Sequence, residues 1–205
     1  MRISKSRNKR RQVAYTVELS EYDAEPPTRT WLLADLPEKI NPELEAVALY
    51  LVFGRWCGGE FIVPQKMGPN TAAAITRHAG MDFFPNPIEY YPKPLIKGTK
   101  SITLSDHLSK IGRQSLVVLN SDSWNGSLKS TSSLIVSTNA NLFEQDDHKF
   151  YSRLAPALLL AEELDMAEVV VDGATSDGFE GLSALFRQVG ISLSCLLYTS
   201  DAADE

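Results

Sequence analysis

Cysteine and long apolar runs are both scarce in this 205-residue chain, and each scarcity excludes a class of protein. The sequence contains 2 cysteines, Cys57 and Cys195, so it is not a disulfide-rich secreted scaffold. Its longest apolar stretch, AVALYLVFG (46–54), is far shorter than the roughly 20 residues that a membrane-spanning helix needs. The basic start MRISKSRNKRR is not followed by the apolar core of a signal peptide. We therefore expect a cytoplasmic protein with no membrane partner.

The end of the chain, CLLYTSDAADE (195–205), is unusual for a different reason. Read back into codons, it resembles a translated transposase adapter of the kind used to build sequencing libraries. We therefore interpret residues 195–205 as a non-native tail and expect the natural chain to continue past Ser194 into a missing C-terminal part. On this interpretation Cys57 is the one natural cysteine, and it cannot form an internal disulfide.

No charge of one sign dominates the sequence. It carries 20 basic and 26 acidic residues, and three of the acidic ones lie in the tail. A slightly acidic chain lacks the basic surface that nucleic-acid binding requires. Contact of the basic segment 1–12 with RNA or anionic lipid is an alternative, but a short basic terminus is typical of a frayed, solvated start. The sequence therefore does not favour a nucleic-acid partner.

Apolar periodicity predicts strands and helices in mixed order. VAYTVEL (13–19) alternates as a half-buried strand does. NPELEAVALYLVFGRW (41–56) predicts a helix that Asn41 caps and in which Pro42 holds the first position. The same reasoning predicts further strands at 30–36, 60–64, 100–106, 114–122, 132–139, 167–173 and 191–194, and further helices at 69–80, 147–164 and 176–190. The expected fold class is α/β with a mixed sheet.

A proline-rich stretch, FFPNPIEYYPKPLIKG (83–98), divides the chain. Its prolines fix the backbone and remove hydrogen-bond donors, so it favours an extended connector between a first lobe (13–82) and a second lobe (99–194). Both lobes have a helix–strand–helix order with matching residues, namely Glu60 and Glu168 near the strand starts and Gly80 and Gly190 after the second helices. A duplicated lobe and a merely shared architecture both explain this likeness.

The stretch VVVDGATSDGFEGL (169–182) contains the first candidate ligand-binding site. A buried strand leads through Asp172 and Gly173 into a loop with Thr175 and Ser176, where a helix begins. The free backbone amides of such a helix start attract phosphate or carboxylate groups. The glycines do not form a dinucleotide-binding fingerprint, and no P-loop lysine follows them. Capping preferences favour the competing interpretation, in which Ser176 or its neighbour simply caps the helix.

Two further loops contain candidate ligand contacts. Asn70 and Thr71 begin the helix predicted at 69–80, although capping and close helix packing explain them equally well. Trp124 lies among amides and hydroxyls in NSDSWNGS (120–127), which suits stacking on a sugar or base. We favour the simpler interpretation of a hairpin loop whose polar residues bond their own backbone.

Histidine is scarce as well, with 3 residues, and none lies at metal-ligand spacing from another. Cys57 follows a predicted helix at its C-terminal end, where the dipole disfavours a thiolate, so a buried structural cysteine is expected. No nucleophile–base or carboxylate pair stands out along the chain. We therefore assign neither a catalytic residue nor a metal site, and the sequence leaves open whether the protein is an enzyme.

Residues 153–186, RLAPALLLAEELDMAEVVVDGATSDGFEGLSALF, resemble a segment upstream of the ATP-binding domain in PP-loop proteins related to the deazaguanine (queuosine-precursor) synthases. The likeness is carried by Ala157 to Leu160, by Val171, Asp172 and Gly173, and by Ser176 and Leu182. The catalytic loop of this family, Ser-Gly-Gly-x-Asp-Ser, is absent from residues 1–194. ATP is therefore implied as a cofactor only if the missing C-terminal part is a PP-loop domain.

This resemblance implies that the chain is the N-terminal substrate-recognition part of an ATP-using enzyme. Its partners would be an unidentified small molecule and the missing part of the same chain. The alternative hypothesis is a non-catalytic binding or scaffold module, which the lack of a catalytic constellation in the sequence supports.

Overall fold

A computed structural model defines the fold and describes residues 1–8, 12–80, 82–144, 151–172 and 178–196. Its strands are β1 (Arg2–Arg7), β2 (Gln12–Glu18), β3 (Thr30–Ala34), β4 (Glu60–Met67), β5 (Phe84–Ile88), β6 (Lys100–Ser105), β7 (Ser115–Asn120), β8 (Ser127–Lys129), β9 (Ser133–Thr138), β10 (Met166–Asp172) and β11 (Ser192–Leu196). Its helices are α1 (Pro42–Phe53), α2 (Pro69–Ala79), α3 (Tyr151–Leu159) and α4 (Phe179–Gln188), with short 3-10 helices η1 (Gly54–Trp56), η2 (Leu108–Lys110) and η3 (Ala140–Phe143). The predicted α/β class is confirmed.

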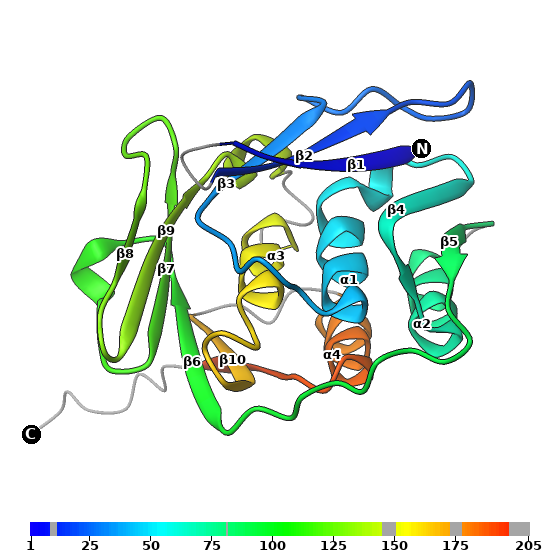
Figure 1. Cartoon of the computed structure of the whole chain (residues 1–205). Coiled ribbons are helices and arrows are strands. Elements are labelled where there is room, and N and C mark those ends of the chain that lie inside the picture. The colour runs from blue at the N-terminus through cyan, green and yellow to red at the C-terminus, as the bar shows by residue number, and fades with distance from the viewer. Residues whose placement is uncertain (9–11, 81, 145–150, 173–177, 197–205) are drawn as a thin grey trace, which may run out of the picture.

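The described strands form one eleven-stranded sheet that curves around the helices (Figure 1). Its strand order is β11-β10-β6-β7-β9-β3-β2-β1-β4-β5, and β8 pairs with β9 off this path. β1, β2 and β3 pair antiparallel, whereas β4 is parallel to both β1 and β5. β11, β10, β6, β7 and β9 form a parallel set. The mixed sheet predicted from the sequence is therefore confirmed.

The strand order is the same in both halves when it is read from opposite ends of the sheet. In each half the last strand forms the outer edge, and the first strand lies third from that edge. The halves differ at their second strands, since β2 runs antiparallel to β1 but β7 runs parallel to β6. The reason is the connection: few residues separate β1 from β2, whereas η2 and its flanking loops carry the chain back before β7 begins.

β3 and β9 join the two halves of the sheet in antiparallel orientation, with Leu33 opposite Thr138. Side chains extend this short ladder. The buried indole of Trp31 donates through Nε1 to Oγ1 of Thr138 at 2.9 Å. The Asn139 side chain accepts from the backbone N–H of Leu32 at 2.7 Å and donates to the carbonyl of Thr30 at 2.9 Å. The two lobes expected from the sequence thus share one continuous sheet.

Helix α1 occupies the centre of the fold, enclosed by the sheet and the other helices (Figure 1). Its residues are apolar on nearly every side, and all of them after Pro42 are buried. A helix that is hydrophobic all round belongs inside a core rather than on a surface. The predicted cap is confirmed, because the Asn41 side chain accepts from the N–H of Glu43 at 3.1 Å.

Three stretches differ from the sequence-based expectations. The basic start is not frayed, because residues 2–7 form β1 between β2 and β4, with Ile3 buried. The proline-rich stretch begins with β5, an edge strand, where proline is tolerated because one side of the strand needs no ladder. The last strand, β11, continues beyond Ser194 and pairs Cys195 with Val171.

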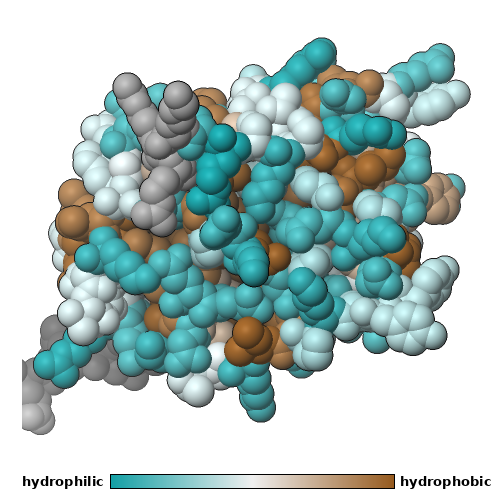
Figure 2. Space-filling model, viewed as in Figure 1, coloured by the Kyte–Doolittle hydropathy of each residue, from teal (hydrophilic) through white to brown (hydrophobic). Residues whose placement is uncertain are grey.

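The surface and the helix lengths agree with the composition. Hydrophilic residues cover most of the face drawn in Figure 2, and apolar side chains form separate areas on it. Within the part of the chain that the structure describes, no helix has the length and apolar character needed to cross a membrane.

Cys57 is buried, as predicted, and its thiol donates to the carbonyl of Glu60 at 3.4 Å. Burial raises the pKa of this thiol.

Candidate functional site

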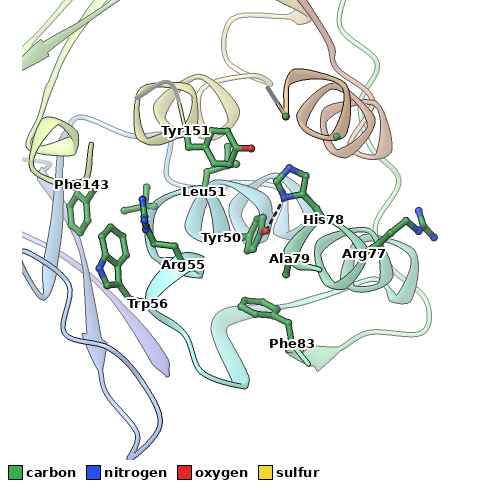
Figure 3. A pocket seen from close by; sticks show the side chains of 14 residues that line it. Tyr50, Leu51, Arg55, Trp56, Arg77, His78, Ala79, Phe83, Phe143 and Tyr151 are labelled. Atoms are coloured by element: carbon green, nitrogen blue, oxygen red, sulfur yellow. Dashed lines mark hydrogen bonds between the residues drawn. The ribbon is translucent and has the colours of Figure 1, made fainter. Parts of the chain in front are cut away.

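A cavity of about 490 Å³ lies where the C-terminal ends of α1 and α2 meet the N-terminal ends of α3 and α4 (Figure 3). The packing of the helices creates this meeting point. α1 and α3 lie antiparallel, since Tyr50 and Tyr151 line the cavity while Asn41 contacts Glu162 beyond the other end of α3. The lining residues come from five parts of the chain: Tyr50, Leu51, Val52, Gly54, Arg55 and Trp56; Arg77, His78 and Ala79; Phe83; Phe143 and Tyr151; Gly178 and Gly181.

A polar cluster of Tyr50, His78 and Tyr151 forms one side of the cavity. The Tyr50 hydroxyl and Nδ1 of His78 are hydrogen-bonded at 2.8 Å (Figure 3). The rings of His78 and Tyr151 have their centroids 5.8 Å apart. Burial, together with the nearby Tyr151, raises the pKa of Tyr50, and burial raises that of Tyr151. Both phenols are therefore protonated at neutral pH and carry a hydrogen-bond donor.

Three further aromatic rings, those of Trp56, Phe83 and Phe143, contribute to the remaining wall. The Tyr50 ring meets the Phe83 ring edge-on, at a centroid distance of 5.4 Å. On the other side, Trp56 and Phe143 pack at 5.9 Å, and the Arg55 guanidinium lies 5.6 Å from the Trp56 ring centroid. Figure 3 shows Arg55 on the Trp56 side of the cavity and His78 on the opposite side. The cavity therefore combines flat apolar walls with polar groups at two separate ends.

Helix α4 contributes small residues to the wall. Its N-cap is Gly178, which has φ of 96° and forms no side-chain cap hydrogen bond. A side-chain carbon at this position would lie 3.5 Å from the Tyr151 hydroxyl, and one at Gly181 would lie 3.5 Å from the His78 ring. Glycine at these two positions thus leaves space between α4 and the polar cluster. The N-cap is therefore Gly178, rather than Ser176 or Asp177, the two residues that the sequence had favoured as the cap.

The described residues include only four of the sequence-predicted site residues, Asn70, Thr71, Trp124 and Asp172, and these lie in three different parts of the chain. Asp172 ends β10, whereas Gly173, Thr175 and Ser176 lie outside the described residues. Asn70 and Thr71 lie at the opposite end of α2 from His78, beside a second and smaller cavity.

Trp124 lies in the loop between β7 and β8. The N–H groups of Ser123 and Trp124 donate to the carbonyl of Asn120 at 3.1 and 3.2 Å, and the Ser123 hydroxyl donates to it at 2.9 Å. The loop bonds its own backbone in this way, which agrees with the simpler of the two interpretations of NSDSWNGS.

Sequence reasoning missed the cavity because its residues are separated along the chain. Tyr50 and Tyr151 stand in helices whose apolar spacing is explained by core packing, and His78 was one of three scattered histidines. The proline of α3, Pro156, gave no hint that the first turn of this helix borders a cavity. One local signal was usable: two of the glycines in 169–182, Gly178 and Gly181, line the cavity.

The described residues contain no group of three or more His, Cys, Asp or Glu side chains that could hold a metal ion. The chemistry that the cavity offers is therefore stacking and hydrogen bonding by Tyr50, His78 and Tyr151, with a cationic group in Arg55. Comparisons with protein-family models, curated proteins and solved structures found no match to this chain. The fold and the cavity together define a mixed α/β protein with a ligand-sized, aromatic-lined pocket.

Proposed function

We propose that this chain recognises a planar small molecule in the cavity between the four helices, as the N-terminal substrate-recognition part of an ATP-using PP-loop enzyme. The observation that carries the recognition is the cavity itself. Its volume of about 490 Å³ falls within the usual range of small-molecule sites. Such sites are mostly apolar with a few polar groups that fix orientation, which is the composition of this wall.

The wall favours a flat ligand with polar edges. The rings of Tyr50, Trp56 and Tyr151 offer faces and edges for stacking, an interaction worth about 0.5–1.5 kcal/mol per aromatic pair beyond the buried area. The phenol of Tyr151 and the imidazole of His78 can donate to or accept from one edge of the ligand. Arg55 can donate to an acceptor on the opposite edge. A planar heterocycle with a carbonyl or anionic substituent satisfies all of these groups.

The PP-loop part of the proposal is supported by the resemblance of residues 153–186. This segment comprises most of α3, all of β10 and the first part of α4, and Gly178 and Gly181 within it line the cavity. In the proposal the cavity holds the substrate, and ATP binds to a domain that lies beyond residue 194. A cytoplasmic location is part of the same proposal and rests on the single cysteine outside residues 195–205.

Fluorescence titration with 7-deazaguanine, a planar bicyclic heterocycle, tests the recognition step. Trp56 lines the cavity, so we expect saturable quenching, measured in a Trp124→Phe background that removes one distant tryptophan. Tyr151→Ala should weaken binding about tenfold because it removes a stacking wall and a donor. Tyr91→Ala is the matched control, since Tyr91 is 91% exposed on the connector. An unsaturable titration, or equal affinities of the two tyrosine variants, would contradict the proposal.

The alternative, a non-catalytic binding module, uses the same cavity and differs in the domain that the gene encodes beyond residue 194. Sequencing the gene past this codon separates the two. A Ser-Gly-Gly-x-Asp-Ser loop in the extension supports the enzyme, and a stop codon or an unrelated domain supports the binding module. Binding at the cavity is expected in either case.

We also propose that the two halves arose by duplication of one unit. The shared strand order supports this, as do the left-handed glycines that come after the second helix of each half, Gly80 (φ 66°) and Gly190 (φ 77°). In such a molecule the N-terminus of α2 in the first half is equivalent to the N-terminus of α4 in the second half.

A further inference from the structure

A second cavity, of about 320 Å³, lies at the N-terminal end of α2. Its lining includes Glu43, Gly68 and Thr71, together with Pro92 and Leu95 of the connector. We propose that this cavity binds the amino or amidino group of a small ligand. The Glu43 carboxylate accepts hydrogen bonds from this cationic group and forms an ion pair with it. This site is separate from the cavity of the proposed function and does not depend on it.

Glu43 is a buried carboxylate stabilised by one backbone N–H and by its place in the first turn of α1, without a cationic side chain as partner among the described residues. Its side chain lines the cavity, and the residue is 5% exposed. Oε1 accepts from the N–H of Gly68 at 2.7 Å. Among the described residues no cation forms an ion pair with it, and no other donor reaches it. Because buried charges are ordinarily paired, this carboxylate calls for a cationic or multiply donating partner.

The neighbouring buried carboxylate, Glu45, shows what full compensation looks like in the same helix. Its Oε1 accepts from Nζ of Lys5 at 2.7 Å and from the hydroxyl of Tyr15 at 2.6 Å. Its Oε2 accepts from Nε2 of Gln65 at 2.6 Å. Glu45 is therefore a structural residue with its lone pairs in use. Glu43, two residues earlier and facing a cavity, has most of its accepting capacity free.

Thr71 provides an independent observation at the same place. It is 2% exposed and lines the cavity, yet its hydroxyl has no hydrogen-bond partner in the part of the chain that the structure describes. The hydroxyl can therefore accept a hydrogen bond from a ligand N–H in the cavity. A carboxylate and a hydroxyl lining the same cavity can accept from the N–H groups of an amidine or from the ammonium of an amine.

The rest of the wall sets the shape of the ligand. Pro92, Pro94 and Leu95 are apolar, so they suit a small hydrophobic body attached to the charged group. The side chain of Lys93 is exposed and makes no ion pair with Glu43, and the amide of Gln188 lies at the end of α4. α2 and α4 pack antiparallel, with His78 beside Gly181 and the start of α2 near Gln188. The smaller cavity therefore lies at the N-terminal end of α2, the second helix of the first half, as the larger cavity lies at the N-terminal end of α4, the second helix of the second half.

Calorimetric titration of the whole chain with benzamidine tests this proposal, with benzamide and benzoate as neutral and anionic controls of the same shape. We expect benzamidine to bind and the two controls to bind at least tenfold more weakly. Glu43→Gln keeps an acceptor for the Gly68 amide and should weaken benzamidine binding at least tenfold. Tyr50→Phe, which alters the larger cavity, should leave benzamidine binding unchanged. Absence of benzamidine binding, or equal binding of benzamide, would overturn the proposal.

Thr71→Val provides a second test that does not alter a charge. The two side chains have nearly the same shape, so the fold is retained, and melting curves check this for both variants. We expect a three- to tenfold loss of benzamidine affinity from the missing hydroxyl. If Glu43→Gln fails to fold, the Thr71→Val result decides: unchanged affinity overturns the site, and a loss supports it.

Discussion

At the scale of single residues, Asn139 has the largest structural role that the sequence did not indicate. Its amide takes the place of a further β-ladder pair, bonding both the N–H of Leu32 and the carbonyl of Thr30. The residue is 8% exposed, so water does not readily replace these bonds. The strand predicted at 132–139 ended within one residue of β9, but the alternation of apolar residues says nothing about what a terminal amide contacts in the other half.

Replacement of Asn139 should therefore weaken the junction between β9 and β3. Asn139→Leu keeps the side-chain size but leaves a backbone donor and a backbone acceptor unpaired, and each such group costs about 1–3 kcal/mol. We expect the free energy of unfolding to fall by about 2–4 kcal/mol, measured by urea denaturation. Asn86→Ala on the edge strand β5 is the control, because its amide bonds only an exposed carboxylate, and it should cost less than about 0.5 kcal/mol. Equal losses in the two variants would show that the junction does not depend on Asn139.

At the scale of elements, the sequence predicted those whose periodicity and end signals agree. The alternation over 13–19 corresponds to β2, whose odd-numbered residues from Val13 to Val17 are buried. The N-cap and proline signals placed α1 correctly at its start. β1 was missed because arginine, lysine and serine occupy most of its positions and Ile3 alone marks the buried face. The burial of Glu43 could not be predicted from local sequence, because it depends on the distant loop at Gly68.

The cap of α1 gives a prediction at this scale. The Asn41 side chain both caps the helix and donates to the carbonyl of Pro94 at 3.4 Å and to Oε1 of Glu162 at 3.3 Å. Asn41→Ala removes all three contacts and should destabilise the protein by about 1–2 kcal/mol. Asn41→Ser retains a capping oxygen but is too short for the other two, so it should recover at least half of the loss. Thermal unfolding measured by circular dichroism checks both; no recovery by serine would place the effect outside the cap.

At the scale of the whole molecule, the sequence correctly indicated α/β architecture, but it could not indicate how the two parts of the chain meet. The connector suggested two bodies, whereas β3 and β9 continue one sheet and α1 packs centrally against α3. Side-chain bonds between distant segments, such as Trp31 to Thr138, create this continuity. The larger cavity results from the same assembly, and for that reason no local pattern marked it.

One shared sheet and one central helix predict a single cooperative unfolding transition. Differential scanning calorimetry should show one peak whose calorimetric and van't Hoff enthalpies agree, as for a two-state domain. The physical reason is that unfolding either half exposes the apolar surface of the other. Two separate peaks would instead mean that residues 13–82 and 99–194 fold independently, as the proline-rich connector suggested. The Asn139→Leu variant is the informative comparison, since a weakened junction should broaden the peak.

The two halves have the same strand order read from opposite ends of the sheet, which bears on how much the fold depends on the peptide chain between them. Each half holds five strands of the main path and two helices, and the halves meet through β3 with β9, α1 with α3 and α2 with α4. The two halves can be compared with two different subunits that the connector holds on one chain. Such a connector favours their association by raising the effective concentration of each half near the other. A backbone nick at the exposed Tyr91 leaves every one of these contacts in place. We expect such a nick to loosen the part of the connector that lines the smaller cavity, so the connector should matter more to that pocket than to the fold.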